Sequence, residues 1–125
     1  TPYLAQLLAT LPRVGPYVFA STGKAGRISD ARASHAQVLQ HAQVKHLTFH
    51  GLRRTFIRQG RNIAPLGVPA QMAGHTPSAV ADGYAILPMD ELRPHAERVE
   101  AHILSLAGVQ FDAQAEPGAL RVVAG

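Results

Sequence analysis

Prolines and glycines divide this sequence into short segments, which limits the chain to short elements joined by turns. The breaks fall at 12–16, 60–69, 74–77, 88 and 108. Proline has no backbone N–H and glycine favours turns, so neither continues a helix easily. Between the breaks, apolar residues recur at helical spacing rather than in alternation. We therefore predict a mainly α fold with several short helices and little strand.

The apolar spacing and the capping residues place the helices. Thr48 is a good N-cap, and Gly108 is suited to end the last helix. Leu52 and Phe56 give the helix after Thr48 an apolar side, and Leu106 lies on the apolar side of the last one. The predicted helices run over 2–11, from Ser29 or Asp30 to about 43, then 49–59, 69–73, 77–84 and 90–107.

Two stretches fall outside this helical pattern. Residues 17–19, Tyr-Val-Phe, predict a short buried strand or extended segment, and the polar run 21–26 after it predicts a loop. The last stretch has weak periodicity and is typical of a mobile tail. We therefore expect one domain over 1–107 and a flexible tail over 108–125.

Composition narrows the classes of protein and of partner. The 125 residues suit a single domain, and the absence of cysteine excludes disulfides and thiolate metal sites. No apolar run is long enough to span a membrane and no leader peptide is visible, so we expect a cytoplasmic location. Twelve Lys and Arg against eight Asp and Glu give a net charge of +4. This charge favours a nucleic-acid partner, although it also serves simple solubility.

The stretch HGLRRTF, residues 50–56, contains the first candidate site residues. His50 and Arg53 are three residues apart, so in a helix they project from the same side. They also fall in the first turn, where free backbone N–H groups and the helix dipole favour an anion such as phosphate. The alternative interpretation is a basic helix start that is exposed to water.

The stretch AGHTPSAVADGYA, residues 73–85, contains two more candidates. Gly74 permits close approach of backbone, and His75 can donate a hydrogen bond. Tyr84 follows nine residues after His75, beside small residues that leave its hydroxyl reachable. Each residue also has a structural explanation, because His75 can cap a turn and Tyr84 can be a core tyrosine with a hydrated hydroxyl.

The order and spacing of these motifs resemble the tyrosine recombinase family, also called the phage integrases. The resemblance covers residues 1–107 and implies the C-terminal part of the integrase catalytic domain. It implies that Tyr84 attacks a DNA phosphate to form a 3′-phosphotyrosyl link. Arg53 would stabilise the phosphate charge, His50 would act as general base and acid, and His75 would donate a hydrogen bond to the phosphate. No metal or other cofactor is implied.

The resemblance further implies site-specific recombination, integration or excision, on double-stranded DNA by a tetramer of integrase protomers on the bacterial nucleoid. The family needs another arginine and a lysine upstream of the matched motifs. We expect both to precede Thr1, so that the chain is a fragment that is inactive alone. Lys24 follows the 17–19 segment instead of preceding the first helix, which indicates a surface lysine.

Further arginines follow Arg53, and other interpretations remain open. Arg54, Arg58 and Arg61 are predicted to contact DNA phosphates, or else to line a solvated helix face. A non-catalytic DNA-binding module would use the same basic face without phosphoryl transfer, and a type IB topoisomerase would share the tyrosine chemistry. A histidine-based metal enzyme is disfavoured because the remaining histidines lack metal-site spacing. These are His35, His41, His46, His95 and His102.

Overall fold

The computed structural model describes residues 1–75 and 86–114 and contains five helices over these ranges. The described part has no β-strand; it has a single antiparallel bridge between Ala20 and Arg27. The prediction of a mainly α fold with short helices and little strand is confirmed. The helices are α1 Pro2–Thr10, α2 Arg32–His41, α3 Phe49–Gly60, α4 Val68–Met72 and α5 Met89–Leu106.

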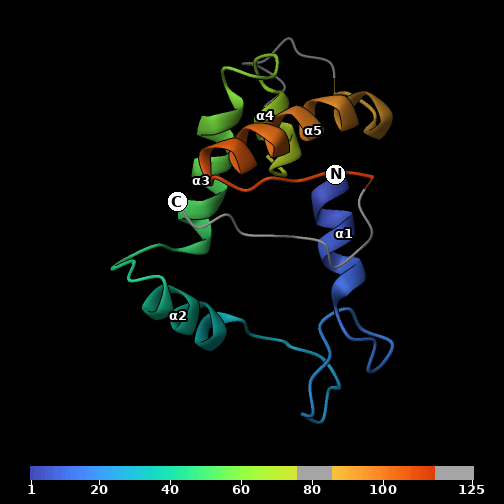
Figure 1. The fold of residues 1–125 in the computed structure, drawn as a ribbon, viewed down its shortest axis with the longest axis vertical. Coiled ribbons are helices and arrows are strands. Elements are labelled where there is room, and N and C mark those ends of the chain that lie inside the picture. Colours follow the sequence, from blue (N-terminus) through green and yellow to red (C-terminus); the bar gives the residue numbers. More distant parts are fainter. Residues whose placement is uncertain (76–85, 115–125) are drawn as a thin grey trace.

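The centre of the fold is formed by α3, α4 and α5, which pack against one another, whereas α1 and α2 extend away from them on two sides (Figure 1). Val99 of α5 is fully buried at this centre, and Ala64 and Val68 are nearly so. Pro69 of α4 is buried beside them. The trio of helices therefore holds the main core, and α1 and α2 depend on contacts at their ends.

Gly60 at the end of α3 is a point of close contact in this core. A Cβ atom built there would lie 2.9 Å from both Cβ and Cγ of Pro69 and 3.5 Å from Cγ2 of Val99. A separation of 2.9 Å is shorter than two non-bonded carbon atoms tolerate, so only glycine lets α4 approach α3 this closely. The missing side chain at Gly60 thus sets the position of α4.

The beginning of α3 follows the sequence prediction. The Thr48 hydroxyl accepts a hydrogen bond from the Gly51 N–H at 2.9 Å, which confirms Thr48 as the N-cap. A Cβ on Gly51 would lie 3.2 Å from Cδ1 of Leu47, so glycine also leaves room for this cap. A ring nitrogen of His35 from α2 lies 2.7 Å from the Leu47 carbonyl oxygen, and this hydrogen bond joins α2 to the start of α3.

Glycines at positive φ separate the later helices as the sequence predicts. Gly67 (φ 85°) precedes α4, Gly74 (φ 75°) follows it, and Gly108 (φ 65°) follows α5. After α5 the Val109 N–H donates to the Leu104 carbonyl at 2.9 Å, which satisfies an otherwise unpaired group at the helix end. The predicted helix over 77–84 lies outside the described residues.

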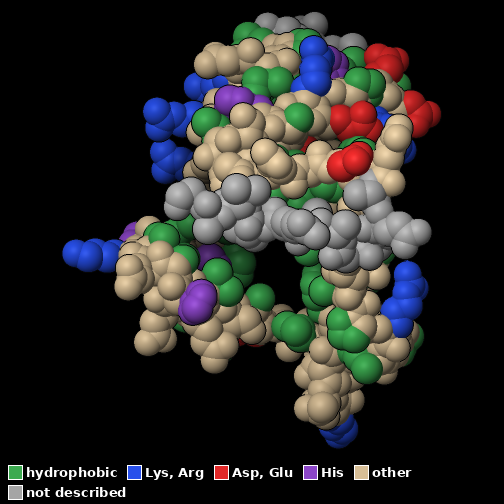
Figure 2. All heavy atoms as spheres, in the orientation of Figure 1, with side chains coloured by type: hydrophobic (Ala, Val, Ile, Leu, Met, Phe, Trp, Pro, Cys, Tyr) green, Lys and Arg blue, Asp and Glu red, His purple; other side chains and the backbone are tan. Residues whose placement is uncertain are grey.

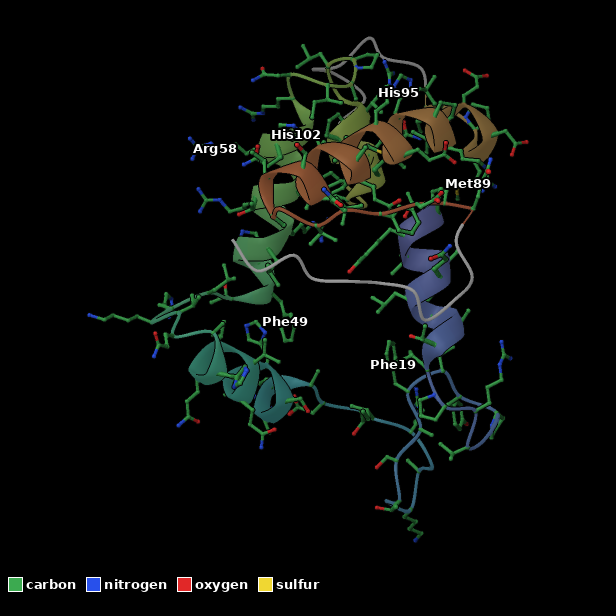
Figure 3. All side chains as sticks on the ribbon, viewed as in Figure 1. Phe19, Phe49, Arg58, Met89, His95 and His102 are labelled. Carbon is green, nitrogen blue, oxygen red and sulfur yellow. The ribbon has the colours of Figure 1, made fainter. Side chains whose placement is uncertain are left out.

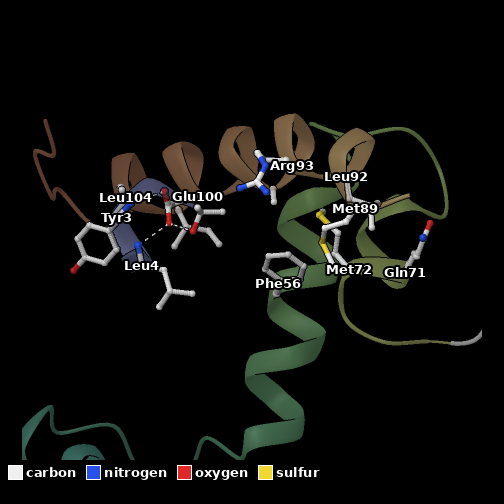
Figure 4. Close-up of a pocket in the computed structure, with 13 residues that line it drawn as sticks. Tyr3, Leu4, Phe56, Gln71, Met72, Met89, Leu92, Arg93, Glu100 and Leu104 are labelled. Carbon is white, nitrogen blue, oxygen red and sulfur yellow. Dashed lines mark hydrogen bonds between the residues drawn. The ribbon is translucent and has the colours of Figure 1, made fainter. Parts of the chain in front are cut away.

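A single carboxylate joins α1 to α5. Glu100 accepts hydrogen bonds from the backbone N–H groups of Tyr3 at 3.0 Å and Leu4 at 3.2 Å, and from the Thr1 hydroxyl (Figure 4). The two backbone donors are free N–H groups of the first turn of α1, which favour a negative partner. The Tyr3 ring also packs edge-on against Phe111, with ring centroids 5.3 Å apart.

Several sequence predictions about burial are wrong. Residues 17–19 are exposed, with Phe19 58% accessible, because no described element covers this segment. Leu52 and Leu106 are 44% and 63% accessible for the same reason.

Helix α2 begins later than predicted, with Ala31 as N-cap, although the Asp30 carboxylate accepts a hydrogen bond from the Arg32 N–H. Hydrogen bonding from the exposed Arg32 side chain lowers the pKa of Asp30.

The end of the described chain runs back along α1. The Gln6 side-chain amide donates to the carbonyl oxygens of Asp112 and Ala113, both at 3.4 Å. The division into a domain over 1–107 and a flexible tail over 108–125 stays a prediction. Within the described ranges, none of the helices has the length and apolar character needed to cross a bilayer.

We predict that Gly60→Ala destabilises the fold by roughly 1–2 kcal/mol, because overpacking against Pro69 outweighs the usual gain in helix propensity. Gly15→Ala is the matched control, since a Cβ there meets nothing within 4 Å. Urea unfolding followed by circular dichroism measures both variants. A Gly60→Ala variant as stable as the parent would contradict the close contact.

Candidate functional site

The candidate site lies where the first two turns of α3 face the turn that ends α4. Gly74 leaves α4 at φ 75°, and its N–H donates to the Gln71 carbonyl at 2.8 Å. The next N–H, that of His75, donates to the Ala70 carbonyl at 2.9 Å. A Cβ built on Gly74 would lie 3.8 Å from Nη2 of Arg53. The Arg53 guanidinium and the Gly-His turn are therefore neighbours, although Gly74 comes 21 positions after Arg53 in the sequence.

His50 lies one turn before Arg53 on α3, and both side chains are exposed. Spacing of three places them on the same side of the helix, as the sequence predicts. His75 is exposed as well. Three of the four predicted catalytic residues thus lie on α3 or on the turn beside it. Tyr84, the fourth, lies outside the described residues.

Arg54, Arg58 and Arg61 follow one side of α3 at spacings of four and three, and all are exposed. Arg58 extends outward from α3 (Figure 3). None of these arginines has a carboxylate partner among the described residues, where the ion pair found is Arg32–Asp30. Figure 2 shows Lys and Arg side chains gathered over α3 and acidic side chains over the beginning of α5, which carries Asp90 and Glu91 in its first turn.

The three arginines border a depression between α3 and α4, which we call the α3–α4 groove. Its volume is about 590 Å³. The exposed members Arg54, Arg58, Arg61, Thr55 and His75 form its rim, together with Gly51. Its half-buried members, Leu47, Ile57 and Ala70, are apolar and form its floor. The described lining contains no acidic residue, so the groove suits an anion with an apolar part.

This groove was not predicted from the sequence. Arg54, Arg58 and Arg61 were expected as a basic run, and their spacing of i, i+4 and i+7 already places them on one helix face. The apolar floor had no comparable signal, because Ala70 comes from α4 and its position depends on the Gly60 contact.

The side chain of Gln71 is a second feature that the sequence did not predict. Its amide donates to the Leu87 carbonyl at 2.7 Å, and its oxygen accepts the Leu87 N–H at 3.2 Å. The Gln71 backbone carbonyl also accepts a hydrogen bond from the Gly74 N–H. One residue of α4 thus binds the chain both just before His75 and just after the stretch that contains Tyr84.

Three of the remaining histidines have structural partners outside this site. His35 bonds to the Leu47 carbonyl, as described above, and its ring lies 4.3 Å from that of Phe49. A ring nitrogen of His102 is 3.3 Å from Oε1 of Gln59, across the contact between α5 and α3. A ring nitrogen of His95 is 2.6 Å from Nη2 of Arg98. Among the described residues, no three His, Asp or Glu side chains group as metal ligands.

A second cavity of similar volume, also about 590 Å³, is an apolar pocket between α1, α3, α4 and α5 (Figure 4). Its lining includes Phe56, Met72, Met89 and Leu92 but none of the predicted catalytic residues. This pocket has no chemistry in common with the site on α3.

Comparison with known proteins agrees with the motifs. The chain is 37% identical, over 118 residues, to the prophage integrase IntF of Escherichia coli strain K12. The match covers 87% of this chain and 25% of the integrase, so the chain spans about a quarter of that relative's length. No family model and no solved structure matches the chain. The identity and the order of the motifs show that the chain belongs to the tyrosine recombinase, or phage integrase, family.

We predict that Gly74→Ala destabilises the fold by about 1–2 kcal/mol, because a left-handed backbone conformation is costly for alanine. Gly74→Asn is the matched control, since it adds the same Cβ atom but tolerates positive φ better. Urea unfolding should rank the parent first, then the asparagine variant, then the alanine variant. Equal stability of all three proteins would show that Gly74 is not needed at φ 75°.

Proposed function

We propose that this chain is the C-terminal part of an integrase catalytic domain and that it acts in site-specific recombination of double-stranded DNA. The observation that carries the proposal is the Arg53 guanidinium beside the Gly74-His75 turn. A guanidinium presents several N–H donors in a plane, a geometry that matches phosphate oxygens. His75 follows Gly74 directly, so a histidine from a second element would complete a phosphate site held from two sides.

In the proposed reaction Tyr84 is the nucleophile. Its phenolic oxygen attacks the scissile phosphorus and the bond from phosphorus to the 5′-oxygen breaks. The leaving 5′-oxygen takes up a proton from solvent, so that a 3′-phosphotyrosyl link and a free 5′-hydroxyl result. A free tyrosine has a pKa of ~10, so the phenol is a weak nucleophile at neutral pH. His50 accepts its proton in the forward step and returns it in the reverse step. The phosphodiester energy is retained in the covalent link, so rejoining needs no ATP.

Arg53 and His75 stabilise the charge that builds up on the non-bridging oxygens. Donors placed for such a transition state are worth roughly 3 kcal/mol each. Both side chains are exposed, so a DNA phosphate can reach them without a rearrangement of the described residues. The proposed reaction uses these cationic and hydrogen-bonding groups and no cofactor.

The wider context is proposed by analogy with the E. coli prophage integrase. The upstream arginine and lysine of the family would come from other parts of the active protein. The active form would be a tetramer of protomers on DNA, located in the cytoplasm at the bacterial nucleoid. Arg54, Arg58 and Arg61 would hold phosphates next to the scissile one.

The reaction is tested with a chimera in which the matched stretch of the E. coli integrase is replaced by this chain, acting on nicked attachment-site DNA that traps the covalent intermediate. We expect a protein–DNA adduct that Tyr84→Phe abolishes and Arg53→Lys slows about 100-fold or more. Tyr17→Phe, at an exposed tyrosine, is the matched control and should leave the adduct unchanged. An adduct that persists in Tyr84→Phe would refute the assignment of the nucleophile.

The same assay separates the alternative, a DNA-binding module without phosphoryl transfer. That alternative predicts DNA binding by the chimera and no adduct. The 125-residue chain alone should bind DNA but form no adduct. An adduct at Tyr84 in the chain alone would contradict the need for upstream residues.

We predict that alanine at Arg54, Arg58 or Arg61 weakens duplex DNA binding by the chain and lowers the slope of log Kd against log salt by about one unit each. Each guanidinium that meets a phosphate displaces about one counterion. Arg93→Ala, an exposed arginine of α5, is the matched control. Fluorescence anisotropy over a range of salt concentrations measures the slopes. Unchanged slopes in all three variants would place these arginines in solvent.

A further inference from the structure

The α3–α4 groove has two kinds of surface, and phosphate contact explains only one of them. The exposed guanidiniums of Arg54, Arg58 and Arg61 suit the phosphates of a DNA strand. The floor of Leu47, Ile57 and Ala70 is apolar and less exposed than these guanidiniums. A phosphate bound at the rim leaves this floor in contact with water, so the floor indicates a ligand that also has an apolar part.

The size of the groove supports the same conclusion. Its volume of about 590 Å³ lies within the range of pockets for small molecules, which is roughly 300–1,000 Å³. A whole nucleotide fits this range, whereas a single phosphate group leaves most of the space empty. The flat face of a nucleobase packs well on apolar side chains and on arginine guanidiniums. A nucleotide therefore matches both the rim and the floor.

We infer that the α3–α4 groove binds one unpaired nucleotide of a DNA strand. The base lies on Leu47, Ile57 and Ala70, and the flanking phosphates contact Arg54, Arg58 and Arg61. A base within a duplex is stacked and paired, so it cannot enter a groove unless it leaves the helix. This inference rests on the proposed function, since it takes DNA as the partner, and it adds a preference for strands with a base out of the stack.

The test compares the affinities of the 125-residue chain for three DNAs. The affinities are measured by fluorescence anisotropy at one salt concentration. The DNAs are a fully paired duplex, the same duplex with one bulged thymine, and the corresponding single strand. We expect the bulged duplex to bind about tenfold more tightly than the paired one, because a base on an apolar or aromatic surface contributes measurably to binding. Equal affinity for the paired and bulged duplexes would overturn the inference.

Variants that fill the groove test whether the preference for the bulged duplex arises there. Thr55→Trp, at an exposed position on the rim, should abolish the preference for the bulged duplex and leave the affinity for the paired duplex within about twofold. Leu52→Trp adds the same ring on α3 outside the groove lining and is the matched control, which should keep the preference. Ala70→Leu fills the groove from α4 and should act as Thr55→Trp does. Thermal unfolding confirms that each variant is folded.

The outcomes separate this inference from the proposed function. Binding to the paired duplex without a preference for the bulge would overturn the inference alone. A preference that survives in both Thr55→Trp and Ala70→Leu would also overturn it, because the base would then bind elsewhere. Failure of the unsubstituted chain to bind any of the three DNAs would contradict the proposed function, and the inference with it.

Discussion

The contact of Gly60 with Pro69 and Val99 is the constraint on which the rest of the structure depends. It brings three helices together at one point, and it does so because no side chain lies between them. From this point α4 leads the chain back along α3. Arg53 lies seven residues before Gly60 on α3, which is about 10 Å along the helix. Between Pro69 and Gly74 the chain runs back toward the start of α3, so the Gly-His turn reaches the Arg53 guanidinium.

This geometry gathers positive charge that the described residues do not neutralise. Arg53, Arg54 and Arg58 lie on α3 and Arg61 is its C-cap, and none of the four has a carboxylate partner in the described part. The exposed Arg32, in contrast, is paired with Asp30. Like charges on one helix repel one another and destabilise it slightly. The fold tolerates this cost because the buried contacts of α3 with α4 and α5 hold the helix in place. The uncompensated charge is then available to an anion.

The sequence predicts most of the helices because their ends depend on local chemistry. Thr48, Gly74 and Gly108 end or begin helices through their own hydrogen bonds and backbone preferences, and they do so as predicted. Burial was predicted less well. Phe19, Leu52 and Leu106 have apolar side chains on suitable faces, but what covers a face depends on distant elements. The same limit applies to the site, since spacing alone pairs His50 with Arg53, whereas the approach of Gly74 depends on Gly60 and Pro69.

The exposure of the candidate residues determines what the chain alone contributes to the proposed DNA site. His50, Arg53 and His75 are all in contact with water, and charges in water interact weakly. A bound DNA strand would displace that water, and the same groups would then act on the phosphate at a lower effective dielectric constant. In the inferred complex the groove floor would add to this effect, because an apolar surface covered by a base excludes further water from the rim. The strength of the proposed site would therefore come from the complex, and the fold of the chain alone supplies the positions of its groups.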